Sequence, residues 1–137
     1  MTIALLADWP RLASAVAEMR FREWATHPGR EELRHWLEVT EREAGRSSLP
    51  LTWAAIAEDG TAIGAVGLGE FDPPTHQDRT PWVLGMIVRP DWRRQGIGRE
   101  LLQALEIHAA CLGFGTVWVA TGNRGRPFYE ACGWRWT

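Results

Sequence analysis

The segment that most constrains how this chain folds runs from residue 82 to residue 120. It begins with the continuous apolar run Trp82–Val88, which is typical of a central strand buried on both faces. A loop that contains Gly96 and Gly98 follows, and leucines then recur at helical spacing before a second apolar run at residues 116–120. Because a strand, a helix and another strand follow in this order, the segment predicts a βαβ unit with parallel strands.

The residues before this unit predict a β-hairpin and a pair of helices. Residues 51–57 and 62–71 are mostly apolar, and the pair Asp59-Gly60 between them is a strong signal for a tight turn. Closer to the N-terminus, apolar residues at helical spacing indicate one helix that ends near Trp24 and a second helix after it.

Length and composition favour one ordinary domain. The chain has 137 residues, of which 45% are hydrophobic and 23% charged, and a chain of this size buries about two thirds of its unfolded surface around one core. With a further short helix expected at residues 127–132, we predict a single domain over residues 1–137. Its expected class is α+β, in the mixed α/β three-layer form, with a central twisted mixed sheet flanked by helices.

Charge and residue usage exclude several kinds of partner. The formal net charge is −2 and the sequence has no long basic run, so the electrostatic footprint of a nucleic-acid-binding protein is missing. The apolar stretches are too short for a membrane span, and no secretory signal is recognisable, so we expect a cytoplasmic protein. The cysteines and histidines lack metal-binding spacing, so we expect no metal and interpret Cys111 and Cys132 as buried thiols.

The loop at residues 93–99 has the composition of an anion-binding site. Gly96 and Gly98 permit backbone geometries that turn several N–H groups toward one point, and the start of a helix adds free donors and partial positive charge. The alternative is a tight strand-to-helix turn with solvated arginines. The loop fits neither a dinucleotide-binding nor a P-loop fingerprint, because Leu101 stands in place of a third glycine and no Lys-Ser or Lys-Thr pair follows.

Arg93, Gly96 and Gly98 fill the pattern of Arg or Gln, two residues, Gly, any residue, and Gly or Ala. Farther along, Asn123 precedes the sequence Phe-Tyr-Glu-Ala-Cys-Gly-Trp at residues 128–134. With these two motifs in this order, the chain resembles the GNAT superfamily of N-acetyltransferases, which has the same loop pattern and a later Asn and Phe-Tyr-Glu-x-x-Gly-aromatic segment. The resemblance implies a GNAT-like fold and acetyl-CoA as co-substrate.

The resemblance covers residues 51–134 and implies where acetyl-CoA binds. The implied site is a V-shaped gap where residues 81–88 and 116–120 splay apart, with strand backbone groups on the pantetheine arm and loop amides on the pyrophosphate. The residues implied to bind the coenzyme are Met86, Ile87, Val88, Arg93, Arg94, Gln95, Gly96, Ile97, Gly98, Arg99, Asn123 and Phe128.

The implied reaction moves an acetyl group to a primary amine of a small molecule or a protein N-terminus, by direct attack in a ternary complex. Tyr129 is the predicted proton donor to the leaving thiolate, and Glu70 is the candidate base, with Glu23, Asp72 or water as alternatives. The predicted acceptor side comprises Glu23, Trp24, Asp72 and Trp82. Solvated carboxylates and core tryptophans are the plainer interpretation of these residues. Acidic groups near the pocket suit a cationic acceptor.

Two further expectations concern the end of the chain and the kind of protein. Family members usually continue beyond the Gly-aromatic pair, so the last strand of the sheet is expected to be missing. The exposed edge at residues 116–120 is then expected to be covered by another segment or by a neighbouring chain, and a homodimer is the favoured alternative. The main alternative to an enzyme is a non-catalytic acyl-CoA-binding or regulatory module. A nucleotide-binding fragment of another α/β fold is disfavoured by the missing fingerprints.

Overall fold

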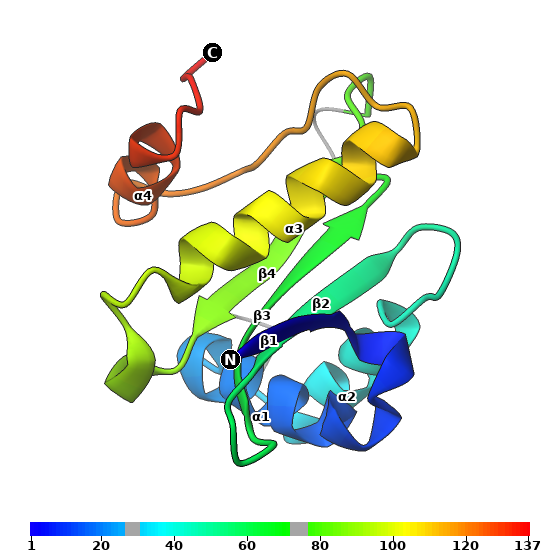
Figure 1. Ribbon diagram of the computed structural model, residues 1–137, viewed down its shortest axis with the longest axis vertical. Coiled ribbons are helices and arrows are strands. Elements are labelled where there is room, and N and C mark those ends of the chain that lie inside the picture. Colours follow the sequence, from blue (N-terminus) through cyan, green and yellow to red (C-terminus); the bar gives the residue numbers. More distant parts are fainter. Residues whose placement is uncertain (27–30, 72–76) are drawn as a thin grey trace.

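The computed structural model describes residues 1–26, 31–71 and 77–137. In this part of the chain, a four-stranded sheet lies between two layers of helices (Figure 1). The strands in chain order are β1 (Thr2–Leu5), β2 (Leu51–Ile56), β3 (Ala62–Gly69) and β4 (Trp82–Val88). This arrangement confirms the predicted α+β class with its three layers.

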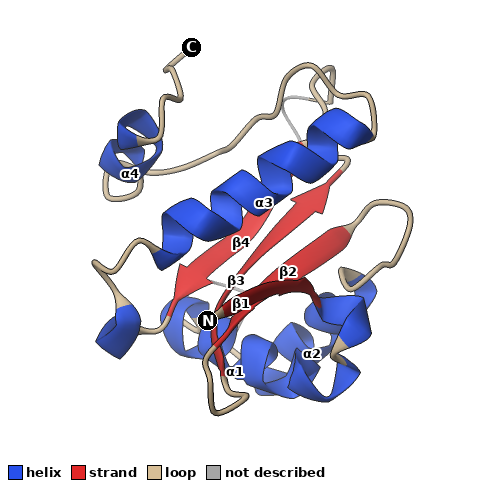
Figure 2. Cartoon of the chain, in the orientation of Figure 1, coloured by secondary structure: helices blue, strands red, loops and turns tan. Residues whose placement is uncertain are grey.

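Helices cover both faces of the sheet. The helix α3 (Ile97–Cys111) lies on one face, and α1 (Ala13–Trp24) and α2 (Leu33–Arg42) lie on the other (Figure 2). The shorter helices are η1 (Leu6–Asp8), η2 (Pro10–Leu12), η4 (Pro90–Trp92) and α4 (Arg126–Ala131). None of the helices within the described ranges combines the length and the apolar character that crossing a membrane requires.

The sheet has the order β1-β2-β3-β4, and all its neighbouring strands are antiparallel. The predicted hairpin is confirmed as β2 and β3, with Leu51 opposite Leu68. Its turn contains Gly60 at φ +86°, and the Asp59 carboxylate accepts a hydrogen bond from the Thr61 N–H at 3.1 Å. The Asp-Gly pair therefore forms the turn because it supplies both a left-handed residue and a side-chain acceptor.

The parallel pairing of the predicted βαβ unit consists of one bridge. Trp82 pairs in parallel with Trp118. The Val83 N–H donates to the Trp118 carbonyl at 2.8 Å, and the Trp118 N–H donates to the Pro81 carbonyl at 2.9 Å. The parallel direction agrees with the prediction, but the prediction of a regular strand over residues 116–120 is wrong, because the pairing with β4 does not continue beyond this bridge.

A β-bulge in β4 accounts for this divergence. Ala65 lies opposite Ile87, whereas Gly67 lies opposite Leu84, so β4 has one residue more than β3 between the two pairs. An extra residue bends a strand and increases its twist. The bend carries the second half of β4 away from residues 119–122.

The core lies on both sides of β2 and β3, which are buried along their whole length. On one face, Leu101, Leu102 and Leu105 of α3 are fully buried. On the other face, Val16 and Met19 of α1 pack against the sheet. Full burial of a leucine stabilises a fold by roughly 1.5–3 kcal/mol, so the periodic leucines of α3 and the apolar hairpin fix the central layers.

Two predictions about burial are wrong. Leu84, Gly85 and Met86 in β4 are only half-buried, because residues 119–122 diverge from this part of the strand. Cys111 is exposed, because it lies at the end of α3, away from the helix face that packs on the sheet.

Gly85 stands in the bulge and touches a buried arginine. Its φ is +50°, a left-handed conformation that favours glycine. A Cβ at this position would lie 2.8 Å from Nε and 2.9 Å from both Cζ and Nη2 of Arg20. Because the three distances are nearly equal, the flat face of the guanidinium, rather than one edge, lies over the glycine.

Replacing Gly85 with alanine is expected to lower the free energy of unfolding by about 2–5 kcal/mol. The left-handed backbone costs an alanine about 1–2 kcal/mol, and the forced shift of Arg20 adds about 1–3 kcal/mol. Urea unfolding measures the loss. Gly113→Ala is the matched control, because Gly113 has φ +94° and a Cβ there meets nothing within 4 Å. Equal losses in the two variants would contradict a steric contact between Arg20 and residue 85.

Candidate active site

The divergence of β4 from residues 119–122 opens a cavity of about 560 Å³, which we call the strand gap. Residues 83–86 border it on the side of β4. The helices α1 and α2 border the opposite side with Trp24 and Trp36, whose ring centroids lie 5.6 Å apart. The gap therefore connects the bulged strand with the two N-terminal helices.

The predicted diphosphate loop leads from η4 into α3. Arg94 has φ +65° and Gly96 has φ +82°, so two left-handed residues turn the chain within three positions. The Glu100 N–H donates to the Gly96 carbonyl at 3.1 Å. Among the described residues, no hydrogen bond is donated by the backbone amides of residues 94–99. Unpaired amides at a helix N-terminus, next to arginines, fit an anion such as a diphosphate.

The helix α4 is held against this loop by two contacts. A Cβ at Gly98 would lie 3.1 Å from Cε1 and 3.2 Å from Cζ of Phe128, so the ring packs where a side chain would otherwise stand. Nη2 of Arg99 donates to the carbonyl of Ala131 at 3.1 Å. These contacts fix the position of Tyr129 relative to the start of α3.

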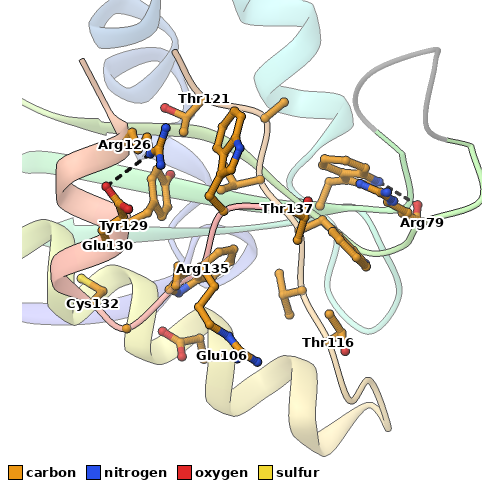
Figure 3. A pocket seen from close by; sticks show the side chains of 18 residues that line it. Arg79, Glu106, Thr116, Thr121, Arg126, Tyr129, Glu130, Cys132, Arg135 and Thr137 are labelled. Atoms are coloured by element: carbon orange, nitrogen blue, oxygen red, sulfur yellow. Dashed lines mark hydrogen bonds and ion pairs between the residues drawn. The ribbon is translucent and has the colours of Figure 1, made fainter. Parts of the chain in front are cut away.

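Tyr129 lies between the strand gap and a second cavity. Its side chain is buried at 7% exposure and packs against the rings of Phe128 and Trp134, with centroids at 5.0 and 5.4 Å. It borders the strand gap and also a cavity of about 820 Å³ along residues 116–121, the outer cavity (Figure 3). Burial, and to a smaller extent Cys132, raises the pKa of Tyr129, so the phenol keeps its proton at physiological pH.

Arg93 fastens the loop to the rest of the protein. Its Nε donates to the Val88 carbonyl at 2.9 Å, and its Nη2 donates to Glu23 at 3.1 Å. The predicted coenzyme residue Arg93 is thus paired with the predicted acceptor residue Glu23. Glu23 borders a different cavity, beside residues 87–91, and is not brought to the strand gap.

Other predicted residues are dispersed. Glu70 is exposed and borders a separate cavity, because it follows the end of β3, opposite the start of β4. Trp82 is buried, donates its indole N–H to the Arg79 carbonyl at 2.7 Å and borders the outer cavity. Asn123 is exposed and borders neither cavity, and Asp72 lies outside the described residues. In the described ranges, no group of three or more His, Cys, Asp or Glu could hold a metal ion.

Sequence reasoning missed three titratable residues of the gap, Arg20, His35 and Glu43. Arg20 is 1% exposed, and its Nη1 donates to Glu43 Oε1 and to Thr40 Oγ1, both at 3.2 Å. The signal was its spacing: Arg20 follows Val16 by four residues and therefore lies on the buried face of α1. An arginine on an apolar helix face requires a partner or a ligand.

The divergence of residues 119–122 from β4, the unpaired amides at a helix N-terminus and the buried Tyr129 fit an acyl-CoA-dependent acyltransferase. The sequence profile of the acetyltransferase (GNAT) family matches residues 9–134. The chain therefore belongs to this family, and it is an acetyltransferase.

Solved structures show the same fold. A GCN5-related N-acetyltransferase from Ralstonia eutropha JMP134 has 26% identity and a TM-score of 0.68, over 99% of this chain and 93% of that one. A predicted acetyltransferase with acetyl-CoA from Clostridium acetobutylicum has 18% identity and a TM-score of 0.73, over 99% and 90%. An aminoglycoside N-acetyltransferase in complex with CoA has 21% identity and a TM-score of 0.76, over 99% and 88%.

Proposed function

We propose that this protein transfers the acetyl group of acetyl-CoA to a primary amine by direct attack in a ternary complex. One observation carries the proposal: the bulged part of β4 and the buried Tyr129 border one opening, and Phe128, the neighbour of Tyr129 in α4, packs on Gly98 in the loop whose amides are unpaired. The proposal puts the diphosphate on this loop and the acceptor on the side of the opening that α1 and α2 border.

The residues present fit acetyl-CoA. The amides of residues 94–99 would hold the pyrophosphate, with Arg94 and Gln95 beside them, and the free edge of residues 86–88 would hold the pantetheine arm through backbone groups. When bound, acetyl-CoA supplies a thioester carbonyl that an amine can attack. A backbone N–H near Ile87 is the proposed donor to the oxygen that gains negative charge.

Tyr129 is the proposed donor to the leaving sulfur. A thiol has a pKa of about 8.5 and a phenol of about 10, so complete proton transfer from a phenol to a thiolate is unfavourable in water. Burial destabilises a thiolate as well as a phenolate, and it raises the pKa of Tyr129. We therefore assign Tyr129 a hydrogen bond to the sulfur as negative charge develops there, and the proton that the amine releases, rather than the phenol's own, completes the thiol after bond cleavage.

The proton of the attacking amine requires an acceptor near the gap. Glu70 is not retained for this role, because it borders another cavity. Besides Tyr129, the described titratable groups of the gap are Arg20, His35 and Glu43, and Glu43 is already paired with Arg20 at 3.2 Å. His35 is therefore the proposed proton acceptor, directly or through water.

Ligand binding and turnover test the proposal separately. Acetyl-CoA and CoA, but not ATP, are expected to raise the thermal midpoint, with about 2.7 kcal/mol of stabilisation at a concentration of one hundred times Kd. At least one amine of a panel is expected to consume the thioester. Coenzyme binding without consumption by any amine would favour the non-catalytic module, and no shift with either coenzyme would refute the proposal.

We also propose that a second copy of the chain covers residues 116–120. Within the described residues, the bridge at Trp118 is the only strand pairing of this segment, so its other edge presents unpaired backbone groups that favour strand addition. Light scattering is expected to give about twice the 15.5 kDa of one chain. A monomer at tens of micromolar would contradict the homodimer.

A further inference from the structure

Arg20 carries two buried donors without a partner. Within the described residues, its Nε and Nη2 have no hydrogen-bond partner, and both are hidden from solvent. Unpaired buried polar groups are rare in folded proteins, and each requires an explanation, such as a ligand or an ordered water molecule. A charged group makes that requirement stronger, because a guanidinium is costly to bury unless its N–H groups are bonded.

The two unpaired nitrogens form one edge of the guanidinium. The third nitrogen, Nη1, already donates to Thr40 and Glu43 at 3.2 Å. The N–H groups of Nε and Nη2 are parallel, which is the geometry that binds both oxygens of a carboxylate. The flat face of the group lies over Gly85, so the glycine does not block this edge.

The position of Arg20 relates it to the reaction. Arg20 borders the strand gap together with Gly85 and Met86, the part of β4 beside which the thioester is proposed to lie. Trp24 and Trp36 border the same cavity from the helices. An oxyanion held by Arg20 would therefore lie close to an amine that attacks from the helical side.

The charges of the gap favour a single negative charge on the ligand. Glu43 lies 3.2 Å from Arg20 and is half-buried, so this pair is already neutral in total. Burial lowers the pKa of Arg20 while Glu43 opposes that effect, and an arginine stays charged in proteins. A carboxylate adds one negative charge to the neutral pair, whereas a phosphate adds nearly two.

We propose that Arg20 determines acceptor specificity by binding a carboxylate, and that the acceptor is a small amine whose carboxylate lies within a few bonds of the reacting nitrogen, as in an amino acid. This inference rests on the proposed function. Because Nε and Nη2 are hidden from solvent, the acceptor reaches them through a small displacement of the neighbouring side chains. This proposal departs from the expected cationic acceptor, because Glu23 and Glu70, two of the acidic residues behind that expectation, border other cavities.

Matched acceptors test the inference on the wild-type protein. Thioester consumption is measured with free amino acids, with their carboxamides, and with amino alcohol phosphates of similar length. We expect kcat/KM for the acids to exceed that for the carboxamides by about 10- to 100-fold, the range for hydrogen bonds to a charged group. Equal use of acids and carboxamides would overturn the proposal, and so would a preference for the phosphates.

Variants of Arg20 test whether this residue causes the preference for acids over carboxamides. Arg20→Lys keeps the positive charge but lacks the two parallel N–H donors of the guanidinium. KM for the acids is therefore expected to rise at least tenfold, while kcat/KM for the carboxamides changes little. Binding is measured independently, as the thermal shift that the preferred acid produces with CoA present, and this shift is expected to disappear. Arg22→Lys is the matched control, because Arg22 is an exposed residue of α1 that pairs with Glu18.

The outcomes separate this inference from the proposed function. If acetyl-CoA raises the thermal midpoint and amines are consumed, but Arg20→Lys lowers turnover of acids and carboxamides equally, Arg20 is only structural and the inference fails alone. If Arg20→Lys does not fold, Arg20→Gln combined with Glu43→Gln removes both charges of the pair, and a retained preference for acids would overturn the proposal. If no amine is consumed by the wild-type protein, the proposed function fails first.

Discussion

Replacement of Tyr129 with phenylalanine is expected to lower kcat for acetyl transfer by about 10²- to 10⁴-fold, the usual contribution of a positioned proton donor. The ring contacts with Phe128 and Trp134, at 5.0 and 5.4 Å, are retained by phenylalanine. The thermal midpoint and its increase with CoA are therefore expected to change little. Steady-state kinetics and a thermal-shift titration of the same preparations measure the two effects.

The pH dependence gives a second measure of the same residue. Burial raises the pKa of Tyr129, so the folded protein holds the proton more tightly than the unfolded chain, and the phenol ionises only above its ordinary value of about 10. Tyr129 is the only tyrosine in the chain, so phenolate absorbance reports on it alone. Ionisation near pH 8, or kcat unchanged in Tyr129→Phe, would remove Tyr129 from the proposed chemistry.

The layers of the fold were predictable because their signals are local. The apolar run Trp82–Val88, the Asp59-Gly60 turn and the leucines of α3 each depend on residues adjacent along the chain, and each element formed where its pattern indicated. Residues 116–120 did not form a strand, because pairing depends on a partner that stays alongside, and the bulge in β4 carries the partner away.

The candidate site was predictable only in part, for a related reason. The glycine loop is one continuous segment, so its free amides follow from the order of strand, glycines and helix. The acceptor side depends on contacts between distant residues: Arg20 meets Glu43 across 23 positions, and no local pattern records that meeting. Glu70 follows β3 directly in sequence, but the antiparallel register puts the end of β3 opposite the start of β4, away from the gap.

The Gly98→Val variant is expected to weaken CoA binding by at least about 100-fold. A Cβ at residue 98 would already lie 3.1 Å from the Phe128 ring, and the two methyl groups of valine add bulk at the start of α3, beside the unpaired amides. Loss of one or two hydrogen bonds to a charged diphosphate, at about 1.5–3 kcal/mol each, corresponds to roughly this factor. Isothermal titration of CoA measures Kd directly.

A glycine beyond the opposite end of α3 supplies the control for this effect. A Cβ at Gly115 would meet nothing within 4 Å, and the backbone of Gly115 is not left-handed, so Gly115→Val tests the cost of a β-branched residue without any contact to the loop. We expect it to bind CoA as the wild-type protein does. Because CoA and acetyl-CoA share the diphosphate, Gly98→Val is expected to lower the affinity for both by the same factor. If residue 98 instead contacted the acetyl group, only the affinity for acetyl-CoA would fall. Unchanged CoA affinity in Gly98→Val would place the diphosphate elsewhere and leave the amides of residues 94–99 without their proposed ligand.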